Sequence, residues 1–286
     1  AKTAGTSDEM VSLMKTGGYD AVSASGDASL RLIYGGQVAP VNTKLLTSYA
    51  TISPFLKNQK WNSVNGVMYG APHGWGANVL AYNSAKVKKP TSWSVVFEKN
   101  TPYKGKITAY DSPIYIADAA MYLMAHNPSL GIKNPYALDQ KQLNAAVALL
   151  KQQKALIGEY WSDYTKSVQS FESQNTLLGS SWQVIANTIN GDKKVKVDST
   201  VPSEGATGWS DTWMISSKAQ HPNCAYQWLN WITSPKINAQ VAEYFGEAPS
   251  NQAACEQTAD KTFCTTYHAK LSLIHISEPT RRTPIS

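Results

Sequence analysis

Short apolar runs typical of β-strands alternate along this chain with longer segments whose apolar residues recur at helical spacing. The strand-like runs cover residues 67–71, 79–82, 106–110, 176–180, 195–201 and 212–216. The helix-like segments cover residues 114–126, 139–154, 183–189, 222–232 and 235–245. Because such alternation without an internal repeat is typical of βαβ units, it predicts an α/β fold with mainly parallel sheets flanked by helices.

The N-terminal region adds a helix, a strand and a second helix to this pattern. A capping box predicts the first helix over about residues 7–16. A strand over residues 19–24 follows and leads into Ser25-Gly26-Asp27. Because open α/β sheets bind ligands in the loops that leave their strands, Ser25 and Asp27 are candidate ligand contacts. Both are equally suitable as turn and N-cap residues.

The segment GATGWSDTWMI, residues 205–215, indicates a binding surface. Side chains two residues apart in a strand share a face, so Trp209, Asp211 and Trp213 project from one side. A carboxylate between two indoles suits an alkylammonium ion, which needs an anion and aromatic faces in place of its water. The pattern also fits a strand with packed indoles and a solvated aspartate. One ammonium–aromatic contact contributes about 0.5–2 kcal/mol and micromolar binding needs about 8 kcal/mol, so other residues must converge on the ligand.

The end of the chain differs from the rest. Residues 271–286 begin LSLIHISEPTR, which looks like a sequencing adaptor translated in one frame, and we exclude them from the fold. The net charge is +6, of which this tail contributes +1 through Arg281, Arg282 and Glu278, leaving +5. The lysines are dispersed, which indicates a solvated surface and no nucleic-acid partner. A cationic ligand would therefore need a locally acidic site.

The remaining chain has no apolar run near the ~20 residues that cross a bilayer, so we do not expect it to span a membrane. It begins in mid-sequence without Met. We expect that a signal peptide and a first strand are missing from it. No linker of low complexity divides the chain, which favours two domains joined by short crossing strands, near residues 75–79 and 206–210.

Searches for catalytic and metal-binding motifs find none. The chain lacks GxSxG, GxxxxGK and GxGxxG, so it predicts no catalytic residue and no cofactor. A pair of glycosidase carboxylates from distant loops stays open. The histidines have no metal-ligand spacing and are interpreted as surface or capping residues; they are His73, His126, His221, His268 and His275.

The three cysteines show no zinc-binding spacing either. Cys255 and Cys264 flank a short polar loop and are a plausible disulfide in an oxidising compartment, with Cys224 left over. Three reduced thiols in a cytosolic protein are the alternative.

Four segments, in order, carry a resemblance to a known family: GGYDAVSASGDASLRLI, MYGAPHGWGANVLAYN, YDSPIYIADAAMYL and VPSEGATGWSDTWMISSKAQHPNCAYQWLNW. They resemble the spermidine/putrescine-binding proteins of bacterial ABC transporters over nearly all of residues 1–268. The resemblance implies a type II periplasmic binding fold, with lobe 1 formed by 1–77 plus 210–268 and lobe 2 by 78–209. It also implies a monomer in the Gram-negative periplasm that captures a polyamine or related small amine between its lobes and passes it to an inner-membrane ABC permease.

The family's ligand contacts fall on Ser25, Trp209 and Asp211. Elsewhere the chain departs from the family pattern. Family aromatic positions fall on Asp27 and Glu247 and at or beside Trp182, and an acidic pair reduces to Asp111 with Tyr115 nearby. We expect Asp27, Asp211 and Glu247 to neutralise two ammonium groups while Trp209 and Trp182 cover the methylenes between them.

Two other functions stay open. The chain could bind 4-aminobutyrate or another small amino compound. Some relatives of this subgroup are described as making short polyhydroxybutyrate chains, and no residue here identifies the nucleophile that this would need. An iron-binding protein of the same fold would need adjacent tyrosine ligands, and the sequence contains none.

Overall fold

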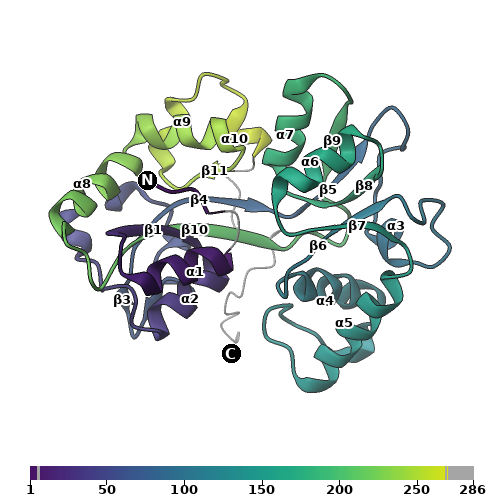
Figure 1. Ribbon diagram of the computed structural model, residues 1–286, viewed down its shortest axis with the longest axis horizontal. Helices are drawn as coiled ribbons and strands as arrows, with labels where there is room; N and C mark the ends of the chain where they lie inside the picture. Colours follow the sequence, from purple (N-terminus) through teal and green to yellow (C-terminus); the bar gives the residue numbers. More distant parts are fainter. Residues whose placement is uncertain (5–6, 268, 270–286) are drawn as a thin grey trace, which may run out of the picture. The chain divides into compact units, whose positions relative to one another are not determined.

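The computed structural model describes residues 1–4, 7–267 and 269 (Figure 1). Of these, residues 1–76 with 209–269 form one compact unit, called unit 1, and residues 77–208 form a second, called unit 2. The backbone passes between the units at 76/77 and again at 208/209. The tail that we assign to an adaptor, residues 271–286, lies outside the described residues.

Unit 1 is built on a four-stranded sheet in the order β1-β10-β4-β11. Its strands are β1 (Ala21–Ser25), β4 (Ala71–Ala77), β10 (Gly208–Ile215) and β11 (Ala248–Pro249). β1 runs antiparallel to β10, and β11 antiparallel to β4. A separate hairpin joins β2 (Ser63–Val64) to β3 (Val67–Met68). The late strand β10 therefore lies between two strands from the N-terminal part of the chain.

Helices cover both faces of this sheet (Figure 1). They are α1 (Ser7–Thr16), α2 (Gly26–Tyr34), α8 (Pro222–Ile232), α9 (Pro235–Phe245) and α10 (Phe263–Thr266), with 3₁₀ turns at Thr43–Leu45, Tyr49–Thr51, Pro54–Leu56 and Gln252–Glu256. Met214 of β10 packs in the cluster formed by α1 and α2. Its neighbour Ile215 packs in the cluster that contains Leu229 of α8. Successive residues of β10 thus serve opposite faces, as a strand between two helical layers requires.

A disulfide lies at the C-terminal end of unit 1. Cys255 and Cys264 are bonded, with their Cα atoms 5.7 Å apart. Cys264 is buried beside Phe263 and Ala242, so the bond closes a short loop against α9. Cys224 is an exposed free thiol on α8.

Unit 2 contains a five-stranded sheet in the order β7-β6-β8-β5-β9. The strands are β5 (Val79–Asn83), β6 (Ile107–Tyr110), β7 (Ile157–Trp161), β8 (Leu178–Ser181) and β9 (Val197–Thr200). β6 runs parallel to β7 and β8, whereas β5 runs antiparallel to β8 and β9.

The expectation of mainly parallel sheets therefore needs correction. In unit 1 the β1–β10 and β4–β11 pairs are antiparallel, and in unit 2 β5 runs against its neighbours. The connections explain the antiparallel pair of β5 and β9 in unit 2. β5 follows β4 after one residue and leads into unit 2, whereas β9 leads out of it toward β10, so the two strands run in opposite directions.

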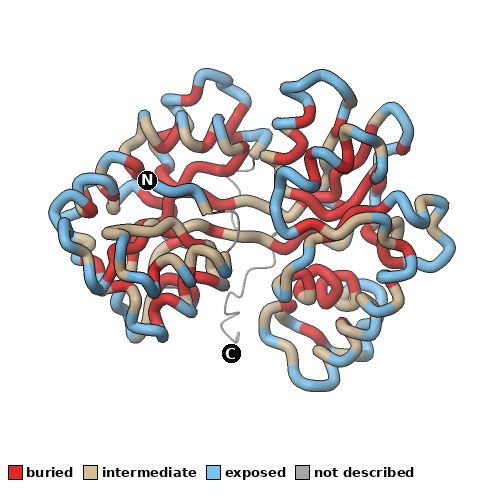
Figure 2. The backbone as a smooth tube through the Cα atoms, viewed as in Figure 1, coloured by how far each residue is buried: buried red, intermediate tan, exposed pale blue. Residues whose placement is uncertain are grey.

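Two layers of helices enclose the sheet of unit 2, and its central strands are buried (Figures 1 and 2). Its helices are α3 (Ser94–Phe97), α4 (Tyr115–His126), α5 (Gln140–Gln153), α6 (Tyr164–Glu172) and α7 (Gln183–Asp192), with a 3₁₀ turn at Pro128–Leu130. Leu80 of β5 packs with residues of α3, α4 and α5. The next residue, Ala81, packs with residues of α6 and α7 on the other face.

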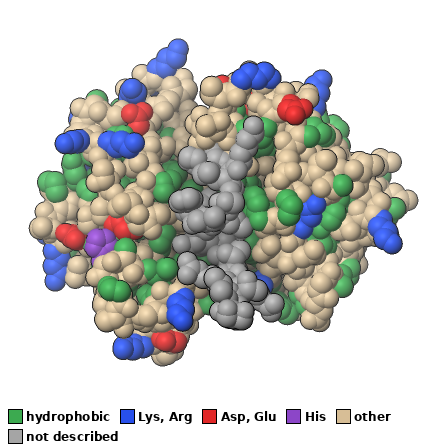
Figure 3. Space-filling view, turned by 180° about the vertical axis from the view of Figure 1, so that it is seen from behind, with side chains coloured by type: hydrophobic (Ala, Val, Ile, Leu, Met, Phe, Trp, Pro, Cys, Tyr) green, Lys and Arg blue, Asp and Glu red, His purple; other side chains and the backbone are tan. Residues whose placement is uncertain are grey.

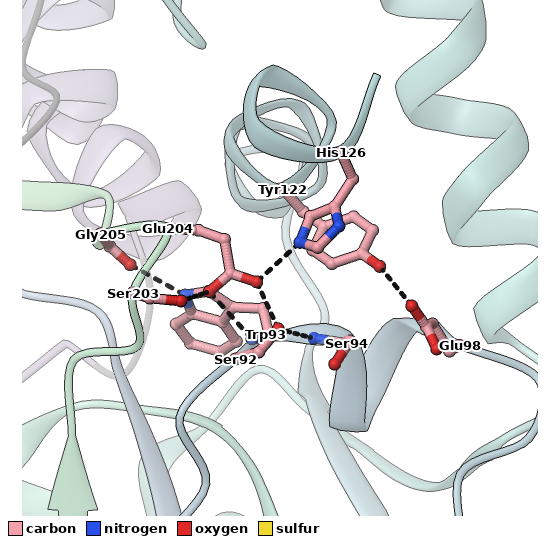
Figure 4. A network of polar contacts seen from close by, with 9 residues as sticks. All are labelled: Ser92, Trp93, Ser94, Glu98, Tyr122, His126, Ser203, Glu204 and Gly205. Atoms are coloured by element: carbon pink, nitrogen blue, oxygen red, sulfur yellow. Dashed lines mark hydrogen bonds and ion pairs between the residues drawn. The ribbon is translucent and has the colours of Figure 1, made fainter. Parts of the chain in front are cut away.

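A polar network holds the segment that precedes the second crossing (Figure 4). The Glu204 carboxylate accepts hydrogen bonds from the hydroxyl of Ser92 and from Nε2 of His126, the latter at 2.8 Å. Trp93 donates its indole N–H to the carbonyl of Gly205 at 2.9 Å. Because the Glu204 side chain is only 3% exposed, these bonds satisfy a carboxylate that burial would otherwise destabilise.

Lysine and arginine side chains are scattered over the face seen in Figure 3. Over the described part of the chain, no helix is both long enough and apolar enough to span a bilayer.

Candidate functional site

β10 presents a polar and aromatic face within unit 1. Its residues Ser210, Thr212 and Met214 are buried, while Trp209, Asp211 and Trp213 between them are half-buried. This alternation places the carboxylate and the two indoles on one side of the strand, as the spacing predicts.

Ser25, the last residue of β1, pairs in register with Asp211. It is also the N-cap residue of α2. The sheet therefore brings two predicted contacts together although 186 positions separate them in the sequence. Asp27 lies in the first turn of α2, and its side chain is outside the described part of the structure.

The indole of Trp209 lies against the backbone of β4. A Cβ atom at Gly76 would come within 2.6 Å of the Trp209 ring, so the residue at position 76 must lack a side chain for the ring to lie there. Phe245 of α9 contacts the same indole edge-on, with ring centroids 5.8 Å apart. These two contacts fix one aromatic wall next to Asp211.

Trp213 is the other indole of this face, and it joins a run of aromatic rings. Its ring lies 5.2 Å from that of Trp228 on α8, which in turn lies 4.9 Å from Trp231. The imidazole of His73 lies 6.2 Å from Trp213, between centroids.

On the same face, Ser23, His73 and Glu247 form a chain of polar contacts, since Ser23 pairs in register with Trp213. Ser23 Oγ is 2.9 Å from His73 Nε2, and Glu247 Oε1 is 3.3 Å from His73 Nδ1. His73 is 8% exposed and Glu247 is 1% exposed. The interpretation of His73 as a surface or capping residue was therefore wrong, because a histidine with a carboxylate partner can be buried.

The charged side chains in and near this chain of contacts affect one another. Burial lowers the pKa of His73, but Glu247, and more weakly Asp211, outweigh that effect and raise its pKa above the usual value. A Cβ atom at Gly74 would overlap the Glu247 carboxylate, so this carboxylate fills the space that glycine leaves. Glu247 was expected to neutralise an ammonium group, whereas in the structure it faces the imidazole of His73.

Ser23, His73 and Glu247 have the order of a nucleophile, a base and an acid. A catalytic triad also requires oxyanion donors and access for a substrate. The low exposure of His73 and Glu247 favours a supporting role beside Asp211 instead.

Unit 2 contains a small cavity of about 10 Å³, which has room for about one water molecule. It is lined by Asn78, Tyr110, Tyr115, Asp118, Trp161, Ser180, Ser181 and Trp182. Tyr110 stacks on Trp161 with centroids 4.6 Å apart, and Trp182 meets both rings edge-on at 5.2 and 4.9 Å. Three rings that pack on one another thus form the aromatic side of the cavity.

Asp118, on α4, is the acidic residue of this cavity and is 2% exposed. Its Oδ1 accepts a hydrogen bond from the Thr207 hydroxyl at 2.7 Å, and that hydroxyl accepts one from Asn78 at 2.6 Å. Burial raises the pKa of Asp118 to about 7, although the Thr207 hydroxyl lowers it in part.

Sequence reasoning missed Asp118. The signal was a single carboxylate within the apolar helix segment YIADAAMYLMAH, where an acidic residue has no solvent to face. It lies three residues after Tyr115, which puts both on one side of α4.

Of the three predicted residues of unit 2, two line the cavity and one is exposed. Tyr115 and Trp182 line the cavity, and the Tyr115 hydroxyl accepts a hydrogen bond from Gln153 at 3.0 Å. Asp111 follows β6 and is exposed. The three were expected in one site, but the cavity contains Asp118 in place of Asp111.

Among the described residues, no group of three His, Cys, Asp or Glu side chains is arranged to hold a metal ion. The side chains that these two sites bring together are mainly carboxylates and aromatic rings, which can bind organic cations.

Comparisons with known proteins find a matching family model and similar sequences. Residues 3–263 match the family model described as bacterial extracellular solute-binding protein. The spermidine/putrescine-binding periplasmic protein of Escherichia coli strain K12 is 24% identical over 242 residues, covering 84% of this chain and 66% of that protein. The chain thus spans about two thirds of the length of this relative.

Solved structures show the same fold. The spermidine/putrescine substrate-binding protein PotD of Streptococcus pneumoniae superposes with a TM-score of 0.77 at 20% identity, covering 97% of this chain and 83% of that one. The Atu4243-GABA receptor gives a TM-score of 0.70 at 20% identity, covering 93% and 77%. The predicted α/β fold of the type II periplasmic binding proteins is confirmed.

Proposed function

Because the chain belongs to the bacterial extracellular solute-binding proteins, we propose that it captures a small organic amine and delivers it to an ABC permease for import. The amine is a polyamine or diamine of the putrescine and spermidine type. We further propose that the protein acts as a monomer in the periplasm of a Gram-negative bacterium. Relatives named for spermidine and putrescine support the ligand class.

The observation that carries the proposal is the face of β10 in unit 1. There, Asp211 lies between Trp209 and Trp213. An ammonium group that leaves water needs a counter-charge, and its carbon chain needs apolar contact. This face offers both within five residues of one strand.

The local charge also favours a cation. Asp211 and Glu247 contribute two negative charges, and His73 contributes one positive charge when it is protonated. The net charge of the three is then −1, although the whole chain is positive. A locally acidic site of this kind attracts amines against the overall charge.

We propose Ser25, Trp209 and Asp211 as ligand contacts in unit 1, with Asp27 next to them. Glu247 acts through His73 by holding the imidazole close to Asp211. In unit 2 we propose Tyr115 and Trp182, with Asp111 as an exposed acidic residue near the site.

Titration calorimetry with putrescine, spermidine and 4-aminobutyrate tests this function. We expect both amines to bind and 4-aminobutyrate to bind more weakly, because its carboxylate would approach Asp211. Asp211→Asn should weaken putrescine binding about tenfold or more, because a charged hydrogen bond contributes about 1.5–3 kcal/mol. Asp8→Asn, which changes an exposed carboxylate of the same unit, is the matched control.

Two results would contradict the proposal. The first is the absence of heat from both amines. The second is tight binding of 4-aminobutyrate alone, which would assign the site to an amino acid.

A further inference from the structure

We propose that the unit 2 cavity beside Asp118 binds a primary ammonium group of the ligand, which makes Asp118 a specificity-determining residue. The inference rests on the proposed function, since it takes the ligand to be an amine. It adds Asp118 to the unit 2 residues proposed above, and it sets a limit on the chemistry of the group that enters the cavity.

The size of the cavity sets that limit. Its volume of about 10 Å³ holds one water molecule. A primary ammonium group is close to water in size and also donates hydrogen bonds. A guanidinium or a trimethylammonium group is several times larger and does not fit without moving the packed rings of Trp161 and Trp182.

The walls of the cavity provide what an ammonium group needs. Asp118 supplies a carboxylate, and Ser180, Ser181 and Asn78 are further polar residues of the lining. The three packed rings of Tyr110, Trp161 and Trp182 supply aromatic surface. Because these rings hold one another in place, the cavity exists before a ligand arrives, which reduces the entropy lost on binding.

Asp118 also has a structural partner, but that partner does not require a charge. Its Oδ1 accepts a hydrogen bond from Thr207, which in turn binds Asn78. An asparagine oxygen would accept the same bond and would avoid burying an ionisable group. The hydrogen bond to Thr207 therefore does not account for an acidic residue at this position, whereas binding of a cation does.

The titratable groups that line the cavity are Asp118 on α4, Tyr115 one helical turn before it, and Tyr110 on β6. Burial raises the pKa of Tyr115 well above its usual range, so its phenol stays neutral. Asp118 is therefore the group whose charge responds to an ammonium ion.

The first experiment measures putrescine binding by calorimetry with the whole chain and three variants. Asp118→Asn keeps the acceptor for Thr207 and should weaken binding about tenfold or more, since the ammonium loses its counter-charge. Asp192→Asn changes an exposed carboxylate of unit 2 and should bind like the unaltered protein. Thr207→Val removes the structural hydrogen bond and should have a smaller effect than Asp118→Asn.

The second experiment needs no variant. Putrescine is compared with its derivatives that carry a trimethylammonium group at one end or at both ends. The derivative with a trimethylammonium group at one end keeps one primary ammonium and should bind within a few-fold of putrescine. The derivative with a trimethylammonium group at both ends keeps both charges but should bind at least about tenfold more weakly, because neither end fits the cavity.

The outcomes separate the two proposals. If putrescine binds but Asp118→Asn binds it equally well, or both methylated compounds match putrescine, the cavity proposal is wrong and the proposed function stands. A loss in Thr207→Val as large as in Asp118→Asn also overturns it, by assigning Asp118 a structural role. If none of the amines binds to the unaltered protein, both proposals fail together.

Discussion

Glu247 of unit 1 and Asp118 of unit 2 are both deeply buried carboxylates, and the two are accommodated differently. Glu247 of unit 1 is 1% exposed and has the imidazole of His73 as its partner, which raises the pKa of that imidazole. Asp118 of unit 2 is 2% exposed and has the hydroxyl of Thr207 as its partner, and its own pKa rises to about 7. A buried acid can recruit a base or keep its proton, so exposure alone does not determine its charge at neutral pH.

The largest effect should come from breaking the pair in unit 1. His73→Ala leaves the Glu247 carboxylate buried without its partner, and we expect a loss of about 3–5 kcal/mol in the free energy of unfolding at pH 7. Urea denaturation measures this. Adding Glu247→Leu to His73→Ala should restore part of the loss, because no unpaired charge then remains buried.

His221→Ala is the matched control, since it removes a histidine whose partner Asp20 is at the surface. Its effect should be much smaller, because water replaces the partner. Equal losses in the two variants would mean that burial of Glu247 is not what makes its pair important.

The second effect concerns pH and the carboxylate of unit 2. Between pH 3.8, the usual pKa, and about 7, folded Asp118 holds a proton that the unfolded chain releases, so stability falls as pH rises through this window. Asp118→Asn removes this contribution. From pH 5 to pH 8 the variant should gain on the order of 2 kcal/mol relative to the unaltered protein, measured by urea denaturation.

His73 should keep some pH dependence in that variant. Its folded pKa is raised, so the stability that its proton provides is complete below the unfolded pKa and is lost as pH rises through the folded value. Denaturation curves of variant and unaltered protein that shift in parallel from pH 5 to pH 8 would show that Asp118 is ionised in the folded state.

The smallest effect should come from the aromatic wall of unit 1. Gly76→Ala places a methyl group 2.6 Å from the Trp209 ring, so the indole must move away from its position beside Asp211. We expect putrescine affinity to fall by about 1 kcal/mol, the value of one ammonium–aromatic contact. Gly191→Ala, where the added methyl group meets no atom within 4 Å, is the control in calorimetry. Unchanged affinity in Gly76→Ala would remove Trp209 from the site.

Much of the fold follows from the sequence, because strong caps and apolar periodicity mark its elements. Helix α1 spans Ser7–Thr16 as predicted, and α8 and α9 also match. Strand β7 and helix α6 were not predicted. The segment YTKSVQSFE of α6 buries only Val168 and Phe171 among its large apolar residues, and these two pack with Trp161. Two apolar positions are too few to identify a helix from the sequence alone.

Residue spacing alone could predict the site only where its residues share a strand, whereas Ser25, Tyr115 and Trp182 were expected from the family resemblance. The face of Trp209, Asp211 and Trp213 follows from the two-residue period of β10. The contacts of Glu247 with His73, and of Asp118 with Thr207, join residues 174 and 89 positions apart. No local pattern in one sequence encodes such pairings, although a lone acid in an apolar helix and a glycine beside a histidine are signals to look for.

The position of β10 between β1 and β4 has a consequence for biogenesis. When residues 1–76 leave the ribosome, their two sheet strands have no common neighbour, because the strand that joins them is made 131 residues later. Unit 2 is continuous in sequence and is complete before that strand emerges. Until β10 emerges, the edges of β1 and β4 that it joins lack this partner, and unpaired strand edges favour aggregation.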